Sequence, residues 1–225
     1  MKRLAALLIT AAALMPVTGC SGKMLFDDLR EIDQLEIIQT LGVDSSGGLL
    51  TATAASSDTE RGVILKNRSA TLSRAMSEMQ SYTNKKYIFY GHTENLLIGQ
   101  KAAEEGIDVF LDYMERSPDM RLSTKLYIVK DATAEQMISE AGRENGGIGS
   151  LLESLEKDVQ LLSESYVFDC GDVAEMIAED GCGIAAAIML TPGENLLFGG
   201  SESTVTAAGY AVFKDAKLVR FIDRY

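Results

Sequence analysis

The fold is decided first by residues 35–55, which read LEIIQTLGVDSSGGLLTATAA. The part 35–43 is mostly apolar and predicts a buried strand, and residues 44–48 have the composition of a tight turn. Small and apolar residues resume at 49–55, so we predict a second strand that pairs with the first as a hairpin. The stretch 56–67 that follows is polar and is predicted to be irregular.

Beyond this hairpin, segments with the periodicity of strands alternate with segments that have the periodicity of helices. Strands are predicted over residues 87–90, 96–98, 125–130 and 185–190, and helices over 100–115, 132–141 and 148–162, after Ser69 and from Asp172 to Ala178. This alternation favours one mixed α/β (α+β) domain over residues 31–195, with a central mixed sheet and flanking helices.

The C-terminal part changes in composition. Residues 196–203 are rich in glycine and serine and are expected to form a linker. Residues 204–225 then contain two apolar stretches around Lys214-Asp215-Ala216-Lys217, which predicts a second β-hairpin. Because a two-stranded hairpin is only marginally stable alone, it either packs on the first domain or begins a second one. We favour the start of a second domain, truncated at Tyr225.

The first nineteen residues have the order of a secretory signal peptide. Lys2 and Arg3 precede an uncharged apolar run at 4–15, and small residues lead to Cys20. This run is short for a membrane-spanning helix. The end of the signal, Val17-Thr18-Gly19-Cys20, resembles a bacterial lipobox, which implies that Cys20 is lipidated and becomes the new N-terminus. Residues 20–30 would then be a lipidated tether. An ordinary signal peptide and an uncleaved anchor are the alternatives.

The charge of the chain narrows the classes of partner. Asp and Glu number 33 against 21 Lys and Arg, a formal net charge of −12, and removal of Lys2 and Arg3 would make the mature chain more negative. Such a balance disfavours binding to nucleic acid or to an anionic membrane surface. No second apolar stretch is long enough to cross a bilayer, so we expect the mature protein to lie outside the membrane.

The sequence shows no catalytic or metal-binding constellation. His92 is the only histidine and has no nucleophile motif around it, so a structural role at a strand junction, with both ring nitrogens hydrogen-bonded, is expected. Cys170 and Cys182 lack metal-ligand spacing; a disulfide between them is possible outside the cytoplasm, but two buried free thiols are favoured. Residues 146–150 predict a flexible loop rather than a phosphate-binding one. No cofactor and no enzyme activity are expected.

Five short patterns follow the lipobox in order. They are Asp28-Leu29-Arg30-Glu31-Ile32, Leu41-Gly42-Val43-Asp44, Tyr90-Gly91-His92 with Ile98-Gly99, Arg116-Ser117-Pro118-Asp119-Met120-Arg121, and Gly209-Tyr210-Ala211-Val212-Phe213-Lys214. In this order they resemble the C-subunit lipoproteins of bacterial spore germinant receptors, the Ger(x)C family. The chain departs from that family in having no tryptophan, in Arg220 where glycine is common, and in its shorter length.

The resemblance implies a non-enzymatic subunit that supports receptor assembly and nutrient-triggered germination of the spore. It also implies a lipid chain such as palmitate on Cys20, a place on the outer face of the spore inner membrane, and the integral-membrane A and B subunits of the same receptor as partners. Which germinant is involved stays open. The alternative from another class is an extracytoplasmic lipoprotein that captures a small solute for an importer.

Overall fold

The computed structural model describes residues 31–56, 62–83, 86–141, 147–161, 166–194 and 201–223. The chain divides into two units, Met1–Gln34 and Leu35–Tyr225. Of the first unit only residues 31–34 are described, and they include the short 3₁₀ helix η2 (Ile32–Gln34).

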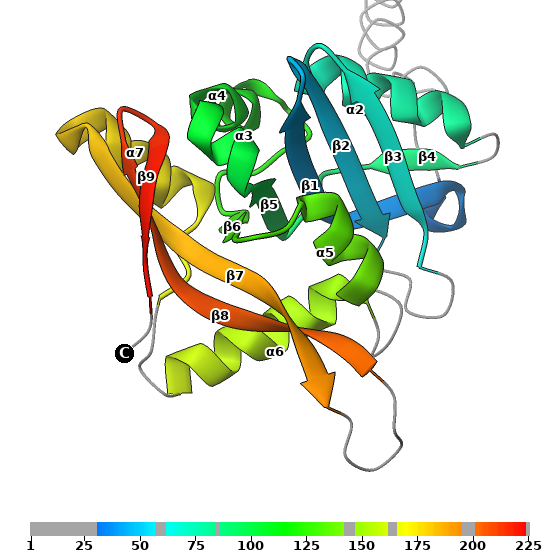
Figure 1. The fold of residues 1–225 in the computed structure, drawn as a ribbon. Coiled ribbons are helices and arrows are strands. Elements are labelled where there is room, and N and C mark those ends of the chain that lie inside the picture. The colour runs from blue at the N-terminus through cyan, green and yellow to red at the C-terminus, as the bar shows by residue number, and fades with distance from the viewer. Residues whose placement is uncertain are drawn as a thin grey trace, which may run out of the picture. The chain divides into compact units, whose positions relative to one another are not determined.

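The second unit is built on one mixed sheet (Figure 1). Its strands are β1 (Leu35–Ser46), β2 (Leu49–Ser56), β3 (Ile64–Ser69), β4 (Tyr87–Phe89), β5 (Asn95–Gly99), β6 (Lys125–Val129), β7 (Cys182–Glu194), β8 (Ser201–Lys214) and β9 (Lys217–Ile222). The strand order is β3-β2-β1-β5-β6-β7-β8-β9, with β4 beside the start of β1. The central strands β1, β5, β6 and β7 are parallel, whereas the strands that flank them on each side are antiparallel.

Helices cover both faces of this sheet (Figure 1). They are α2 (Leu72–Met79), followed by the 3₁₀ turn η3 (Gln80–Tyr82), α3 (Gln100–Glu105), α4 (Asp108–Arg116), α5 (Ala134–Ala141), α6 (Ile148–Leu161) and α7 (Cys170–Asp180). The buried side chains of α2, α3, α4 and α7 belong to one hydrophobic cluster, and those of α5 and α6 belong to a second. The two-residue period of the strands sends alternate side chains into each cluster. Leu96 and Ile98 of β5 face the first cluster, and Leu97 faces the second.

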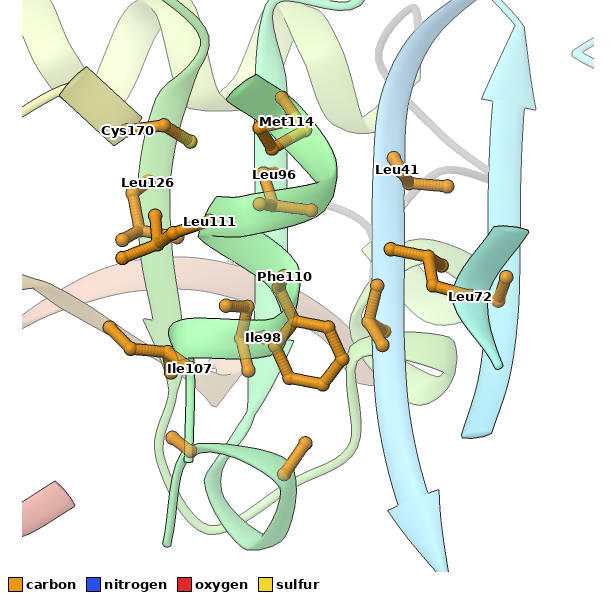
Figure 2. Packing of buried hydrophobic residues seen from close by; sticks show 14 of the residues in the cluster. Leu41, Leu72, Leu96, Ile98, Ile107, Phe110, Leu111, Met114, Leu126 and Cys170 are labelled. Carbon is orange, nitrogen blue, oxygen red and sulfur yellow. The ribbon is translucent and has the colours of Figure 1, made fainter. Parts of the chain in front are cut away.

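The larger cluster is centred on α4. Figure 2 shows Phe110, Leu111 and Met114 of this helix over Leu96 and Ile98 of the neighbouring strand. Phe110 is 2% exposed, so nearly all of its ring is removed from water. Burial of apolar surface on this scale is the main force that holds a helix to a sheet.

The sequence-based fold class, a mixed α/β sheet with flanking helices, is confirmed. The first hairpin is also confirmed: Ser46 pairs with Leu49 across Gly47 and Gly48, both at positive φ, as a two-residue turn of this kind requires. The prediction that 56–67 is irregular is wrong at its end, where β3 begins at Ile64.

Three helix predictions are corrected by the structure. The helix expected over 100–115 is two helices, because the chain turns at Gly106 with φ of 136°. Thr71, not Ser69, caps α2 by accepting the backbone N–H of Arg74. Asp169, not Asp172, is the N-cap of α7; Asp172 is the third helical residue of a reciprocal capping box.

The predicted C-terminal hairpin is present as β8 and β9, and it continues the same sheet because β8 pairs with β7 along most of its length. The expectation that residues 204–225 begin a further domain stays a prediction. Of the expected linker 196–203, residues 196–200 lie outside the described part, and 201–203 are the first residues of β8. The strand predicted over 185–190 is longer on both sides, as β7. It continues through Pro192, where β6 does not pair with it, so the missing N–H of this proline costs no hydrogen bond to β6.

We predict that Phe110→Ala lowers the free energy of unfolding by about 3–5 kcal/mol, because it removes a buried ring and leaves a cavity. The neighbouring Val109 is 55% exposed, so Val109→Ala is the matched control and should change stability by less than about 0.5 kcal/mol. Urea denaturation followed by circular dichroism measures both. Equal losses for the two variants would contradict the placement of α4.

Candidate functional site

At the carboxyl ends of the parallel strands, one side chain of the sheet binds the N-terminus of a helix. Asp44, near the end of β1, accepts the backbone N–H of Ala134 at 2.8 Å with Oδ1 and that of Glu135 at 2.9 Å with Oδ2. Thr133 and Gln136 cap the same helix reciprocally, each side chain accepting the backbone N–H of the other. The free N–H groups at the start of α5 are therefore satisfied by the protein.

Two glycines make room for this contact. A Cβ atom on Gly99 would lie 2.1 Å from Oδ1 of Asp44, and one on Gly42 would lie 2.7 Å from the side chain of Ile138 in α5. Neither glycine has a positive φ, so both are required for space rather than for backbone conformation. The motifs Leu41–Asp44 and Ile98-Gly99 thus meet at one structural node, where the sheet holds α5.

Burial raises the pKa of the Asp44 carboxyl above its ordinary value of 3.8, and the two backbone N–H groups of α5 oppose this shift. In open α/β sheets, ligands usually bind outside the carboxyl ends of the strands, where helix N-termini attract anions. Here the protein's own carboxylate occupies such a helix terminus. The node is therefore structural.

A pocket of about 440 Å³ lies at the other end of the strands, where β5 and β6 begin. It is lined by Gln39, His92, Thr93, Glu94, Asn95, Arg121, Ser123, Lys125, Gly149, Glu153 and Glu156. Three of these, at 149, 153 and 156, form one stripe along α6, since they follow the spacing of neighbours on a helix face. The others come from the start of β1, from the loops before β5 and β6, and from the first residues of these two strands.

The polar groups of the pocket are partly paired. Lys125 Nζ lies 3.1 Å from Oε1 of Glu156, and Gln39 donates to Glu94 at 2.9 Å. His92, expected to have a structural role, lies in the turn before β5 with its side chain 57% exposed and Nε2 3.5 Å from Glu94. Within the described part, no partner is found for its other ring nitrogen, which differs from the expectation that both are bonded.

Ser123, His92 and Glu94 all line the pocket, and they are the residue types of a hydrolase triad. In the part of the chain that the structure describes, no hydrogen bond joins Ser123 to His92, so the contact that activates such a serine is not made. Among the same residues, no group of three or more His, Cys, Asp and Glu is placed to hold a metal ion.

Of the remaining predicted positions, the two cysteines are free thiols. Cys170 is buried, which raises the pKa of its thiol to about 12, whereas Cys182 is exposed and not buried as expected. In the motif 116–121, Arg116 pairs with Asp112 at 2.7 Å and Arg121 lines the pocket. The predicted loop at 146–150 has its first residue outside the described part and is wrong at its end, because α6 begins at Ile148; Gly149 of this helix lies against Gln39. The lipidation site Cys20 is also outside the described residues.

Sequence reasoning did not find the pocket. It gave no role to Gln39, Lys125, Glu153 or Glu156. The spacing 149, 153, 156 on one face of α6 was a usable signal, but the strands that complete the pocket are far apart in sequence. None of the helices formed by the described residues is long and apolar enough to cross a bilayer.

The fold and its surface define the chain as a mixed α/β domain with a polar pocket beside the start of its central strands. A family model described as the spore germination protein N-terminal domain matches residues 28–190, which is more than half of the chain. The chain therefore belongs to this family, as its motifs predicted, and its function is connected with spore germination. Neither curated proteins nor solved structures give a match.

We predict that Gly99→Ala lowers the free energy of unfolding by about 1–3 kcal/mol, because the added methyl group collides with the Asp44 carboxylate. The control is the same change made in an Asp44→Ala background, where the collision is absent and the cost of the methyl group should be smaller. A double-mutant cycle by chemical denaturation measures this coupling. Strict additivity of the two changes would contradict the contact.

The raised pKa of Asp44 predicts a pH dependence. A carboxyl group whose pKa is higher in the folded state keeps its proton longer there, so folding loses stability as the pH rises from about 3.8 through the raised pKa. The stability of the wild type relative to Asp44→Asn should therefore fall over that window. Glu78→Gln is the control of opposite sign. The hydrogen bond from Arg74 lowers the pKa of Glu78, so the stability of the wild type relative to this variant should rise with pH. Thermal unfolding at a series of pH values tests both directions.

Proposed function

We propose that this chain is a membrane-anchored lipoprotein subunit of a spore germinant receptor that supports receptor assembly and the response to nutrient without catalysis. The observation that carries the proposal is the arrangement of the chain: the matched germination domain begins at residue 28, shortly after the predicted signal at 1–19 and Cys20. A short tether from a lipidated cysteine would hold the domain at the membrane surface.

The lipid anchor fits the physical properties of the chain. A single acyl chain gives only marginal membrane binding, at about 0.8 kcal/mol per buried CH₂, whereas two chains hold a protein stably. The chain is acidic, with a formal net charge of −12 over its 225 residues, and has little electrostatic attraction to anionic lipids, so attachment would depend on Cys20. The proposed place is the outer face of the spore inner membrane, beside the integral-membrane A and B subunits.

A non-catalytic role is supported by what surrounds His92. Its side chain is 57% exposed and contacts Glu94, and Ser123 makes no hydrogen bond with it among the described residues. A hydrolase would need the nucleophile and the base within hydrogen-bond reach. If a hydrolytic turnover were measured and His92→Ala abolished it, the non-enzymatic proposal would be wrong.

We predict that Cys20→Ala abolishes lipidation and releases the chain from the membrane. Mass spectrometry of the N-terminal peptide from cell-derived protein should show a diacylglyceryl cysteine at position 20 in the wild type. Cys182→Ala is the control, because that thiol is also free but lies in the folded domain. An unmodified Cys20 on wild-type protein found in the medium would contradict the anchor.

The receptor role is tested separately in spores. Deletion of the gene, together with any paralogue, should slow germination in response to at least one nutrient, and the Cys20→Ala allele should not restore it. Normal germination of the deletion strain with all nutrients would contradict the role.

The second candidate, capture of a small solute for an importer, is favoured by the polar pocket. It predicts loss of solute uptake in growing cells rather than a germination defect.

A further inference from the structure

The pocket at the start of β5 and β6 has a charge pattern that neither the family nor the proposed function explains. Two of its three glutamates are neutralised by lysines of the protein. Lys125 lies 3.1 Å from Glu156, and Lys157, on the next turn of α6, lies 2.6 Å from Glu153. These pairs leave little net charge on that side of the pocket.

Two charged groups remain without a partner of opposite fixed charge. Arg121 has no carboxylate within 4.0 Å among the described residues. Glu94 is contacted by the amide of Gln39 at 2.9 Å and by His92 Nε2 at 3.5 Å, but by no lysine or arginine of the described chain. The pocket therefore presents one guanidinium and one carboxylate that are not joined to each other.

We propose that this pocket binds a small zwitterion, a molecule with one carboxylate and one ammonium group a few bonds apart. The carboxylate would pair with Arg121, whose planar guanidinium suits two parallel hydrogen bonds. Ser123, in the same loop before β6, also lines the pocket. The ammonium would pair with Glu94. This ligand site goes beyond the proposed role as a receptor subunit, which assigns no ligand to the chain, and it gives a chemical class to the solute of the second candidate function.

Ligands with a single charge fit this pocket less well. A simple anion that pairs with Arg121 leaves Glu94 without a partner, and a simple cation that pairs with Glu94 leaves Arg121 without one. Only a molecule that carries both charges gains from both unpaired groups, which is how a site of mixed charge discriminates. The volume of about 440 Å³ holds a short zwitterion with further substituents.

The test uses the full chain purified in detergent, so that the result does not depend on a lipid anchor or on the germination phenotype. Glycine, β-alanine and γ-aminobutyrate serve as zwitterions of increasing charge separation, and acetate and methylammonium supply each charge alone. Binding is followed by NMR chemical-shift changes of the backbone amides of residues 92–95 and 121–125. At least one zwitterion should bind more tightly than either singly charged probe.

Two variants and a control locate the site. Arg121→Gln and Glu94→Gln should each weaken binding of the preferred zwitterion about tenfold, because each removes a charged hydrogen bond. Arg116→Gln is the matched control, since Arg116 lies on α4 and pairs with Asp112 outside the pocket. Unchanged circular dichroism spectra establish that the variants are folded.

Three results would overturn the proposal. They are the absence of shifts with every zwitterion at high millimolar concentration, binding of acetate or methylammonium as tight as that of the best zwitterion, and zwitterion binding that neither pocket variant weakens. None of these results bears on the anchor or on germination, so the proposed function and the ligand site fail independently.

Discussion

The contact of the Asp44 carboxylate with the first two N–H groups of α5 is the interaction on which one whole face of the sheet depends. It attaches the helix to the end of β1, ninety residues away in sequence, with both oxygens in use. Once α5 is placed, Met137 and Ile138 lie on the second hydrophobic cluster, and α6 extends that cover. Loss of the carboxylate would leave buried N–H groups without partners, so this contact specifies position as well as stability.

The same contact accounts for where an open pocket is found. A helix N-terminus beside the carboxyl ends of parallel strands would attract an anion, but Asp44 already provides one. The polar pocket lies instead at the amino ends of β5 and β6, between their preceding loops and one face of α6. Its charged groups are carried by exposed or half-buried side chains, which can exchange partners without disturbing either hydrophobic cluster.

The pattern of apolar residues was enough to predict the central strands and most helices. β5 and β6 are buried on both faces, so they form short continuous apolar runs, whereas α4 and α6 show the period of about 3.6 that burial of one helix face imposes. It missed β3, since an edge strand has one exposed side and carries polar residues such as Lys66 and Asn67. The break at Gly106 was missed because the apolar face continues across it. The pocket could not be predicted, since Gln39, Glu94, Arg121 and Glu153 meet only after long-range strand pairing.

The C-terminal hairpin belongs physically to the folded unit that carries the germination domain. The family match ends at residue 190, within β7, yet β8 supplies Ala211 and Phe213 to the larger hydrophobic cluster. The N–H of Ile107, at the point where α3 gives way to α4, donates to the carbonyl of Ala216 in the hairpin turn at 2.9 Å. Without the hairpin, β7 would lose a long strand partner and the large cluster would lose part of its cover. The unit that folds is therefore longer than the segment that the family match covers.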